Sequence, residues 1–194
     1  QQVDDPQTLY DHPVNLFVGG FIGSPAMNLL HTRLDTQNGG LVARVGEQEI
    51  RLSEQVTSSR PGLKGYGGRD VVLGIRPENL EDAAVASDAA AGDRLRGEVV
   101  LREALGSEIM AHIAIEGRAA ETDETRELAQ DAGAPEEQEI GVEEGKTILV
   151  ARFNARSRVK QGETAEIAVD TEALHFFDPE TGLGIYDDSK GAGS

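Results

Sequence analysis

The residues from 141 to 147 come closest to a stretch that could bind a nucleotide. They read Gly-Val-Glu-Glu-Gly-Lys-Thr, and a phosphate-binding loop also ends in Gly-Lys followed by Ser or Thr. That loop, however, places four residues between its glycines and opens a helix. Here only three residues separate Gly141 from Gly145, two of them are acidic, and the following Ile148 to Val150 is typical of a strand. We therefore predict a charged turn, and no ATP binding by this chain.

Histidine, cysteine and serine give no catalytic or metal-binding pattern. The four histidines are His12, His31, His112 and His175, and no two of them have the short spacing of a local metal site. The chain has no cysteine, which excludes disulfides and thiolate chemistry, and it has no Gly-x-Ser-x-Gly turn. His112 alternates with apolar residues, so we expect it to point outward. The sequence predicts no catalytic residue, no metal site and no cofactor in this chain.

The charge of the chain argues against nucleic acid as a partner. There are 18 Lys and Arg against 35 Asp and Glu, which gives a net charge of −17. Such a surface repels phosphate backbones and anionic lipids. No apolar run approaches the roughly 20 residues that cross a bilayer, and no signal peptide is visible, so the expected compartment is the cytoplasm.

The elements that position these residues are mostly short strands. Pro6 and Asn15 suit the first turn and the cap of two helices before residue 25, and the second helix is so apolar that it must cover either the following domain or a surface upstream of residue 1. After it, turn signals such as Asn38-Gly39-Gly40 separate apolar runs. The predicted strands span residues 28–35, 41–45, 49–52, 70–75, 96–104, 108–115, 147–153, 165–169, 175–177 and 184–186. Residues 53–68 are predicted to be a loop.

This pattern predicts a mainly β fold. Its strand number fits an OB-type five-stranded barrel with an additional small β-sheet, preceded by the short helices. Within it, residues 119–145 are read as an acidic, solvated insertion, because Glu121 to Glu144 contains ten acidic residues and one basic residue, with no apolar stripe to bury.

Several blocks of the sequence resemble the end of maltose-type sugar ABC transporter ATP-binding subunits. The blocks run in the order of that family over nearly the whole chain. They are Pro6 to Tyr10 with Pro13, Asn15, Leu16-Phe17-Val18, Gly20-Phe21-Ile22-Gly23-Ser24-Pro25 and Met27-Asn28, then Gly74-Ile75-Arg76-Pro77-Glu78-Asn79-Leu80, Glu103-Ala104-Leu105-Gly106-Ser107-Glu108, Leu149 to Arg152, Gly162-Glu163, and His175-Phe176-Phe177-Asp178 with Thr181-Gly182.

The resemblance implies a division of the chain into parts. Residues 1–25 are then the helical tail of an ATPase domain that lies upstream, with its Walker motifs, and residues 26–190 form a transport-associated OB-type (TOBE) regulatory domain. The final residues 191–194 are interpreted as a tail added during cloning.

The resemblance also implies a function that is not enzymatic in this chain. The domain would regulate the subunit and hold two subunits together as a homodimer, and it could receive a regulatory protein. ATP and magnesium would bind only to the full-length parent. Through that parent the domain would work with the membrane subunits, at the cytoplasmic face of the cell membrane.

Two groups of residues are the candidate sites. We expect a dimer or regulatory surface at Glu103, Leu105, Gly106 and Glu108 together with His175, Phe177 and Asp178. Consecutive strand residues face opposite ways, so of Phe176 and Phe177 one is expected to fill the core and Phe177 to anchor the interface, unless the final strand covers both. In the turn motif, either Arg76 and Glu78 form an ion pair or Pro77 alone sets the turn.

A second class of function is a small-ligand sensor for an oxyanion or a sugar. The basic residues appear scattered along the sequence and the net charge is negative, so an anion pocket is not favoured. The sequence does not identify the transported sugar.

Overall fold

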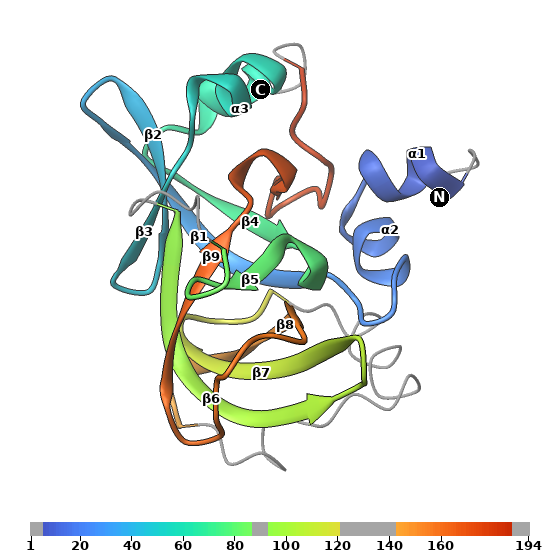
Figure 1. The fold of residues 1–194 in the computed structure, drawn as a ribbon. Helices are drawn as coiled ribbons and strands as arrows, with labels where there is room; N and C mark the ends of the chain where they lie inside the picture. Colours follow the sequence, from blue (N-terminus) through green and yellow to red (C-terminus); the bar gives the residue numbers. More distant parts are fainter. Residues whose placement is uncertain (1–5, 87–92, 121–142, 188–194) are drawn as a thin grey trace.

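The computed structural model of the protein describes residues 6–86, 93–120 and 143–187. These residues form two five-stranded antiparallel sheets with two short helices at the amino-terminal end (Figure 1). The acidic run of the predicted insertion and residues 191–194 lie mostly or wholly outside the described ranges, so their predicted roles stay predictions.

The first sheet has the strand order β10-β4-β1-β2-β3. The turn between β1 and β2 is the predicted Asn-Gly hairpin, with positive φ at Asn38 (53°) and Gly39 (82°), as a two-residue turn between twisted strands requires. The strands are β1 (Asn28–Gln37), β2 (Gly40–Val45), β3 (Gln48–Arg51), β4 (Arg69–Ile75) and β10 (His175–Phe177). Among the described residues, the last strand therefore completes a sheet that the first four strands began.

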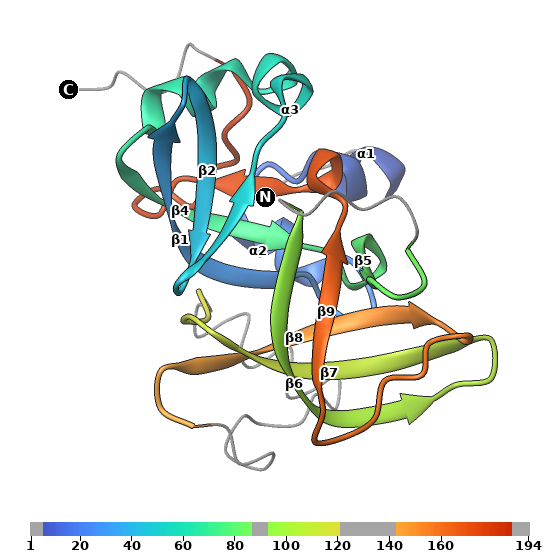
Figure 2. The ribbon, with the colours of Figure 1, turned by 60° about the vertical axis from the view of Figure 1, so that its left-hand side comes forward.

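The second sheet has the order β5-β9-β6-β7-β8 and curls into a half-barrel (Figure 2). The long strand β6 pairs with β9 through its first half and with β7 through its second half, with a register shift between Val99 and Leu101. The strands are β5 (Leu80–Asp82), β6 (Arg94–Ala104), β7 (Glu108–Glu116), β8 (Lys146–Asn154) and β9 (Thr164–Val169). The mainly β fold with an OB-type sheet and an additional sheet is confirmed.

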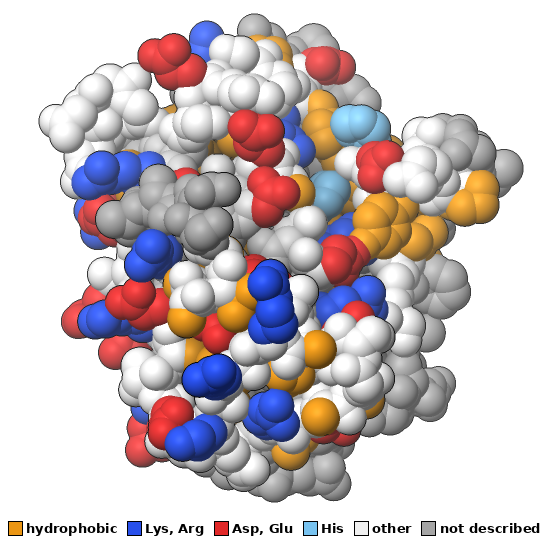
Figure 3. Space-filling view, viewed as in Figure 1, with side chains coloured by type: hydrophobic (Ala, Val, Ile, Leu, Met, Phe, Trp, Pro, Cys, Tyr) orange, Lys and Arg blue, Asp and Glu red, His pale blue; other side chains and the backbone are white. Residues whose placement is uncertain are grey.

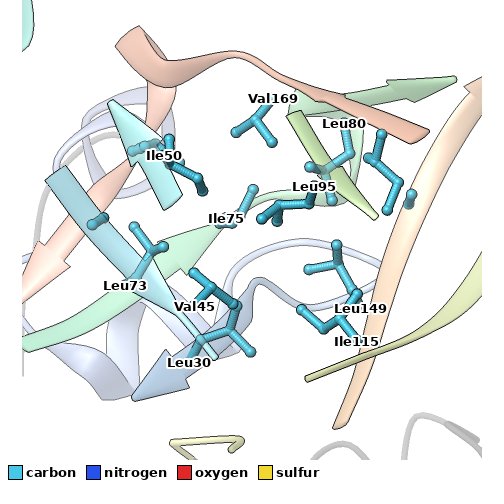
Figure 4. Packing of buried hydrophobic residues seen from close by; sticks show 14 of the residues in the cluster. Leu30, Val45, Ile50, Leu73, Ile75, Leu80, Leu95, Ile115, Leu149 and Val169 are labelled. Carbon is cyan, nitrogen blue, oxygen red and sulfur yellow. The ribbon is translucent and has the colours of Figure 1, made fainter. Parts of the chain in front are cut away.

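The two sheets share one hydrophobic core. Leu30 and Leu73 of the first sheet face Leu95, Ile115 and Leu149 of the second across its interior (Figure 4). Because these side chains are at most 1% exposed, neither sheet could lose the other without exposing a large apolar face.

The amino-terminal helices pack on the outer face of the first sheet. They are α1 (Pro6–Asp11) and α2 (Leu16–Phe21), and the Asn15 side chain accepts a hydrogen bond from Val18 N at the start of α2. Leu16 joins Val72 and Phe177 in a second apolar cluster. The apolar residues Leu16 and Val18 are thus buried within this chain.

Three parts of the predicted strand and loop pattern were wrong. Residues 53–68 form a helix and a 3₁₀ helix instead of a loop, because Ser53 caps the first turn and Val56 is buried. Strand β5 was missed, and residues 184–186 contribute only a bridge between Gly184 and Phe177. The short helices are α3 (Glu54–Ser59), η1 (Pro61–Tyr66), η2 (Pro77–Asn79) and η3 (Thr171–Ala173).

Candidate regulatory surface and the arginine junction

The β6–β7 hairpin carries one half of the predicted surface at its tip. Leu105 is 54% exposed there, and Gly106 has a φ of 85°, which suits a tight turn. Glu103 is exposed beside it, and the half-buried Glu108 lies 3.5 Å from Arg152 Nε. The tip is therefore an apolar side chain flanked by carboxylates, a composition that can contact another protein.

His112 lies in strand β7 of this hairpin and is buried, so the prediction that it points outward was wrong. It is 6% exposed, and its Nε2 lies 3.2 Å from Glu103 Oε2. The apolar alternation misled because β7 lies between two other strands of a curled sheet and is covered on both faces.

The other half of the predicted surface, at β10, is mostly buried. Phe176 lies in the main core and Phe177, which is 0% exposed, lies under α2. The two rings do face opposite ways as predicted, but a second layer covers Phe177. An outward Phe177 is therefore a wrong expectation, and His175 is also buried.

Asp178 shapes the turn that follows β10. Its Oδ1 accepts hydrogen bonds from Thr181 N (2.8 Å) and Glu180 N (3.0 Å), and its Oδ2 accepts one from the Tyr66 hydroxyl (2.7 Å). Burial, together with this hydrogen bond to Asp178, raises the pKa of Tyr66 to about 12. Asp178 thus connects the turn to η1.

Arg76 connects the amino-terminal helices to the sheets. Its guanidinium donates to Ile22 O and to Tyr10 O, both at 2.7 Å, and lies 3.6 Å above the Tyr10 ring. Of the two alternatives, the ion pair with Glu78 is absent from the interactions of the described residues, because Arg76 is 2% exposed under the helices while Glu78 faces solvent. Pro77 opens η2, so the proline sets the turn and Arg76 anchors the helices.

A pocket of about 200 Å³ lies between the amino-terminal junction and the carboxy-terminal segment. Its wall includes Val14, Gly62, Tyr66, Asp178, Leu183 and Tyr186. Two of its apolar lining residues, Val14 and Leu183, are 38% and 41% exposed.

The described residues give no support for metal or nucleotide chemistry. They contain no group of three or more His, Asp or Glu side chains that could hold a metal ion. Lys146 begins strand β8 and its Nζ lies 2.7 Å from Glu143 Oε2. A strand follows the glycine-lysine pair, whereas a phosphate-binding loop opens a helix.

The sequence reasoning missed Arg60, and it wrongly treated the basic residues as scattered. In the structure both Arg60 and Arg76 are buried, and burial, followed by the charges of Arg76 and Arg60, lowers the pKa of His175. Arg60 follows α3, Arg76 follows β4 and His175 begins β10, so no local spacing could have related them.

Comparison with known families gives two matches that meet at the Arg76 motif. A family model described as the MalK OB fold domain matches residues 23–80, and one described as the TOBE domain matches residues 73–139. The first contains β1 to β4, and the second begins at the end of β4 and continues into the second sheet.

Individual relatives match nearly the whole chain. The trehalose/maltose import ATP-binding protein MalK of Thermococcus litoralis is 34% identical over 187 residues, which are 96% of this chain and 41% of the relative. The oligosaccharides import ATP-binding protein MsmX of Bacillus subtilis is 32% identical, over 95% of this chain and 41% of its own length. The trehalose import ATP-binding protein SugC of Mycobacterium tuberculosis is 35% identical, over 95% and 44%. The chain thus spans about two fifths of these relatives.

The two sheets and the matched models define a MalK-type OB and TOBE region, which is the regulatory carboxy-terminal part of ABC importer ATP-binding subunits. Over nearly its whole length the chain is similar to part of the ATP-binding subunits of sugar importers, among them MalK, MsmX and SugC. Within the described ranges, no helix has the length and apolar character needed to cross a membrane.

Proposed function

We propose that this chain is the regulatory and dimerisation region of the ATP-binding subunit of a sugar-importing ABC transporter. The observation that carries the proposal is the match of OB and TOBE models in tandem, together with relatives named as sugar importers over nearly the whole chain. Such a region acts by contact, and it does not hydrolyse ATP.

The mechanism rests on effective concentration. ATPase domains that separate and close again do so faster when a second contact keeps them together. The exposed hairpin tip at Leu105 supplies a candidate contact, and Arg76 fixes the helices to which an upstream domain would be joined. Movement of that domain would then be transmitted to the sheets through a buried cation rather than a loose linker.

The partners and cofactors follow from this assignment. The partners are a second copy of the chain, the ATPase domain of the same subunit, the membrane subunits of the transporter and possible regulatory proteins, all at the cytoplasmic face of the membrane. ATP and magnesium belong to the full-length protein. The relatives' names include trehalose, maltose, oligosaccharides and sn-glycerol-3-phosphate, so the family alone does not select the sugar.

Sedimentation velocity over a range of protein concentrations tests the dimer. We expect a weak dimer that Leu105→Asp dissociates, because an isolated carboxylate cannot be buried in the contact. Leu183→Asp is the matched control, since it places the same charge on another exposed leucine and should leave the dimer intact. Phe177→Asp is unsuitable because it would disrupt the core. A chain that stays monomeric at the highest attainable concentration would contradict the proposal.

A further inference from the structure

The turn between β1 and β2 presents an Asn-Gly pair to solvent. The two strands pair as far as Gln37 and Gly40, so Asn38 and Gly39 alone form the turn, and both residues are exposed. The hairpin projects from the first sheet (Figure 1), and in the space-filling view from the same side its end appears white, without charged or hydrophobic side chains (Figure 3). Water therefore has access to the pair.

Two groups in this turn could react with each other. The side-chain amide carbon of an asparagine can be attacked by the backbone nitrogen of the next residue. Among the described residues, neither the Asn38 side chain nor the Gly39 N–H has a hydrogen-bond partner. Nothing lies within 4 Å of the Cβ position of Gly39, so no neighbour would have to move as the nitrogen approaches the carbon. Turn ends also open locally at little cost in free energy.

The side chains of two other asparagines are held by hydrogen bonds. Asn28 is buried; its Nδ2 donates to Ile75 O and Val150 O, both at 2.9 Å, and its Oδ1 accepts from Val150 N at 2.7 Å. Asn154 is exposed, but its Oδ1 accepts from Arg156 N at 2.9 Å. These bonds would have to break before either amide could react.

The remaining two asparagines are followed by backbone nitrogens that are already engaged. The residue after Asn15 donates its N–H to Gly182 O at 2.8 Å, and the residue after Asn79 donates to Pro77 O. Of the five asparagines in the chain, only Asn38 precedes a glycine. Both the sequence and the hydrogen bonding therefore single out this one position.

We propose that Asn38 is a site of uncatalysed deamidation. Gly39 N attacks Asn38 Cγ; a new C–N bond forms, the bond to the side-chain nitrogen breaks, and that nitrogen leaves as ammonia with the proton from Gly39 N. Water then opens the resulting succinimide at one of its two carbonyl carbons. The product carries aspartate or isoaspartate at position 38. Water is the sole co-reactant, and no electron is transferred.

The modification changes both charge and backbone at the end of the hairpin. Either product adds one negative charge to a turn whose residues carry none. Isoaspartate also adds a methylene group to the backbone, so Gln37 and Gly40 could no longer be joined by the two-residue turn that their pairing requires. Because the turn fixes the register of the strands, the isoaspartyl form should be less stable than the aspartyl form. This inference does not depend on the transporter assignment.

Peptide mapping of the aged chain tests the site. The 194-residue chain is incubated folded and in urea, at neutral and at mildly alkaline pH, and each asparagine is followed by mass spectrometry with a protease that cleaves before aspartate but not before isoaspartate. We expect Asn38 to convert in the folded chain no more than about tenfold more slowly than in urea, which corresponds to about 1.4 kcal/mol of activation free energy. Asn28, Asn79 and Asn154 serve as internal controls and should stay intact in the folded chain over the same time.

Variants separate the chemistry from the fold. Gly39→Ala shields the attacking nitrogen and should slow the conversion at least about tenfold in urea, where strain in the turn plays no part. Gly65→Ala makes the same change at another exposed glycine with open space around it and should leave the rate unchanged. Asn38→Asp carries the charge without the additional methylene, so its Tm should exceed that of the purified isoaspartyl protein.

Three results would overturn the proposal. The first is an Asn38 that stays intact in the folded chain while it converts in urea, which would mean that the turn protects it. The second is conversion of Asn154 as fast as that of Asn38 in the folded chain. The third is an unchanged rate in Gly39→Ala.

Discussion

Arg76 and His175 share one buried face of the first sheet but carry different charges. Arg76 keeps its proton because the carbonyls of Tyr10 and Ile22 accept from its guanidinium and the Tyr10 ring covers it. His175 has no hydrogen bond at Nδ1, and it is neutral because burial, and then the charges of Arg76, Arg60 and His12, lower its pKa against the opposing effect of Asp11.

The buried neutral His175 predicts a loss of stability on mild acidification. Its pKa is about 3 in the folded chain against 6.5 ordinarily, so below about pH 6.5 only the unfolded chain takes up this proton. Its stabilising contribution is therefore complete above that pH and falls by about 1.4 kcal/mol per pH unit below it. Urea unfolding at about pH 7.5 and 5 should show a loss about 2 kcal/mol larger in the parent than in His175→Gln. Equal losses would mean that His175 is hydrated.

For single residues, the sequence indicated which positions matter better than it indicated what their side chains contact. Arg76 and Asp178 stood out in the family motifs, but their partners Tyr10 and Tyr66 lie 66 and 112 residues away. Arg60 lies outside every motif. Contacts between remote residues depend on the tertiary structure, so no spacing rule could have predicted that Arg60 and Arg76 are buried.

The strands were more predictable than the segments between them. Asn38-Gly39 predicted its hairpin because both residues need positive φ, which few residue types tolerate. The segment from Ser53 to Gly68 failed because its glycines suggested a loop, while one serine cap and buried Val56 suffice for a short helix. His112 failed because alternation cannot reveal that a curled sheet is covered on both faces.

Gly97 allows β6 to cross from β9 to β7. A Cβ atom there would lie 2.5 Å from Ala114 O and 2.6 Å from Ile113 Cγ2. We therefore expect Gly97→Ala to lower the free energy of unfolding by about 1–3 kcal/mol, the usual effect of overpacking. Gly65→Ala is the control in the same denaturation experiment, since nothing lies within 4 Å of its Cβ position. Equal effects of the two substitutions would show that the loss of stability in Gly97→Ala comes from backbone propensity and not from packing.

For the whole molecule, charge opposes the proposed self-association. Each copy carries −17, and the hairpin tip is flanked by Glu103 and Glu108. Salt screens such repulsion over about 10 Å at 0.1 M. We expect the dimer, followed by sedimentation velocity, to become tighter as sodium chloride is raised from about 50 to 300 mM, which is opposite to an interface held by ion pairs. Weaker association at higher salt would mean that an ion-pair interface forms the dimer.

The pairing of β10 with β4 has a consequence for synthesis. The entire second sheet lies between these two strands in the chain, so the first sheet has an open edge at β4 until the last strand leaves the ribosome. Until then Val72 and Leu73 have neither His175 to Phe177 beside them nor the ring of Phe177 under α2. The first sheet can therefore be completed only after the second sheet has been synthesised, and messages that end before the codon for Phe177 should yield aggregation-prone protein.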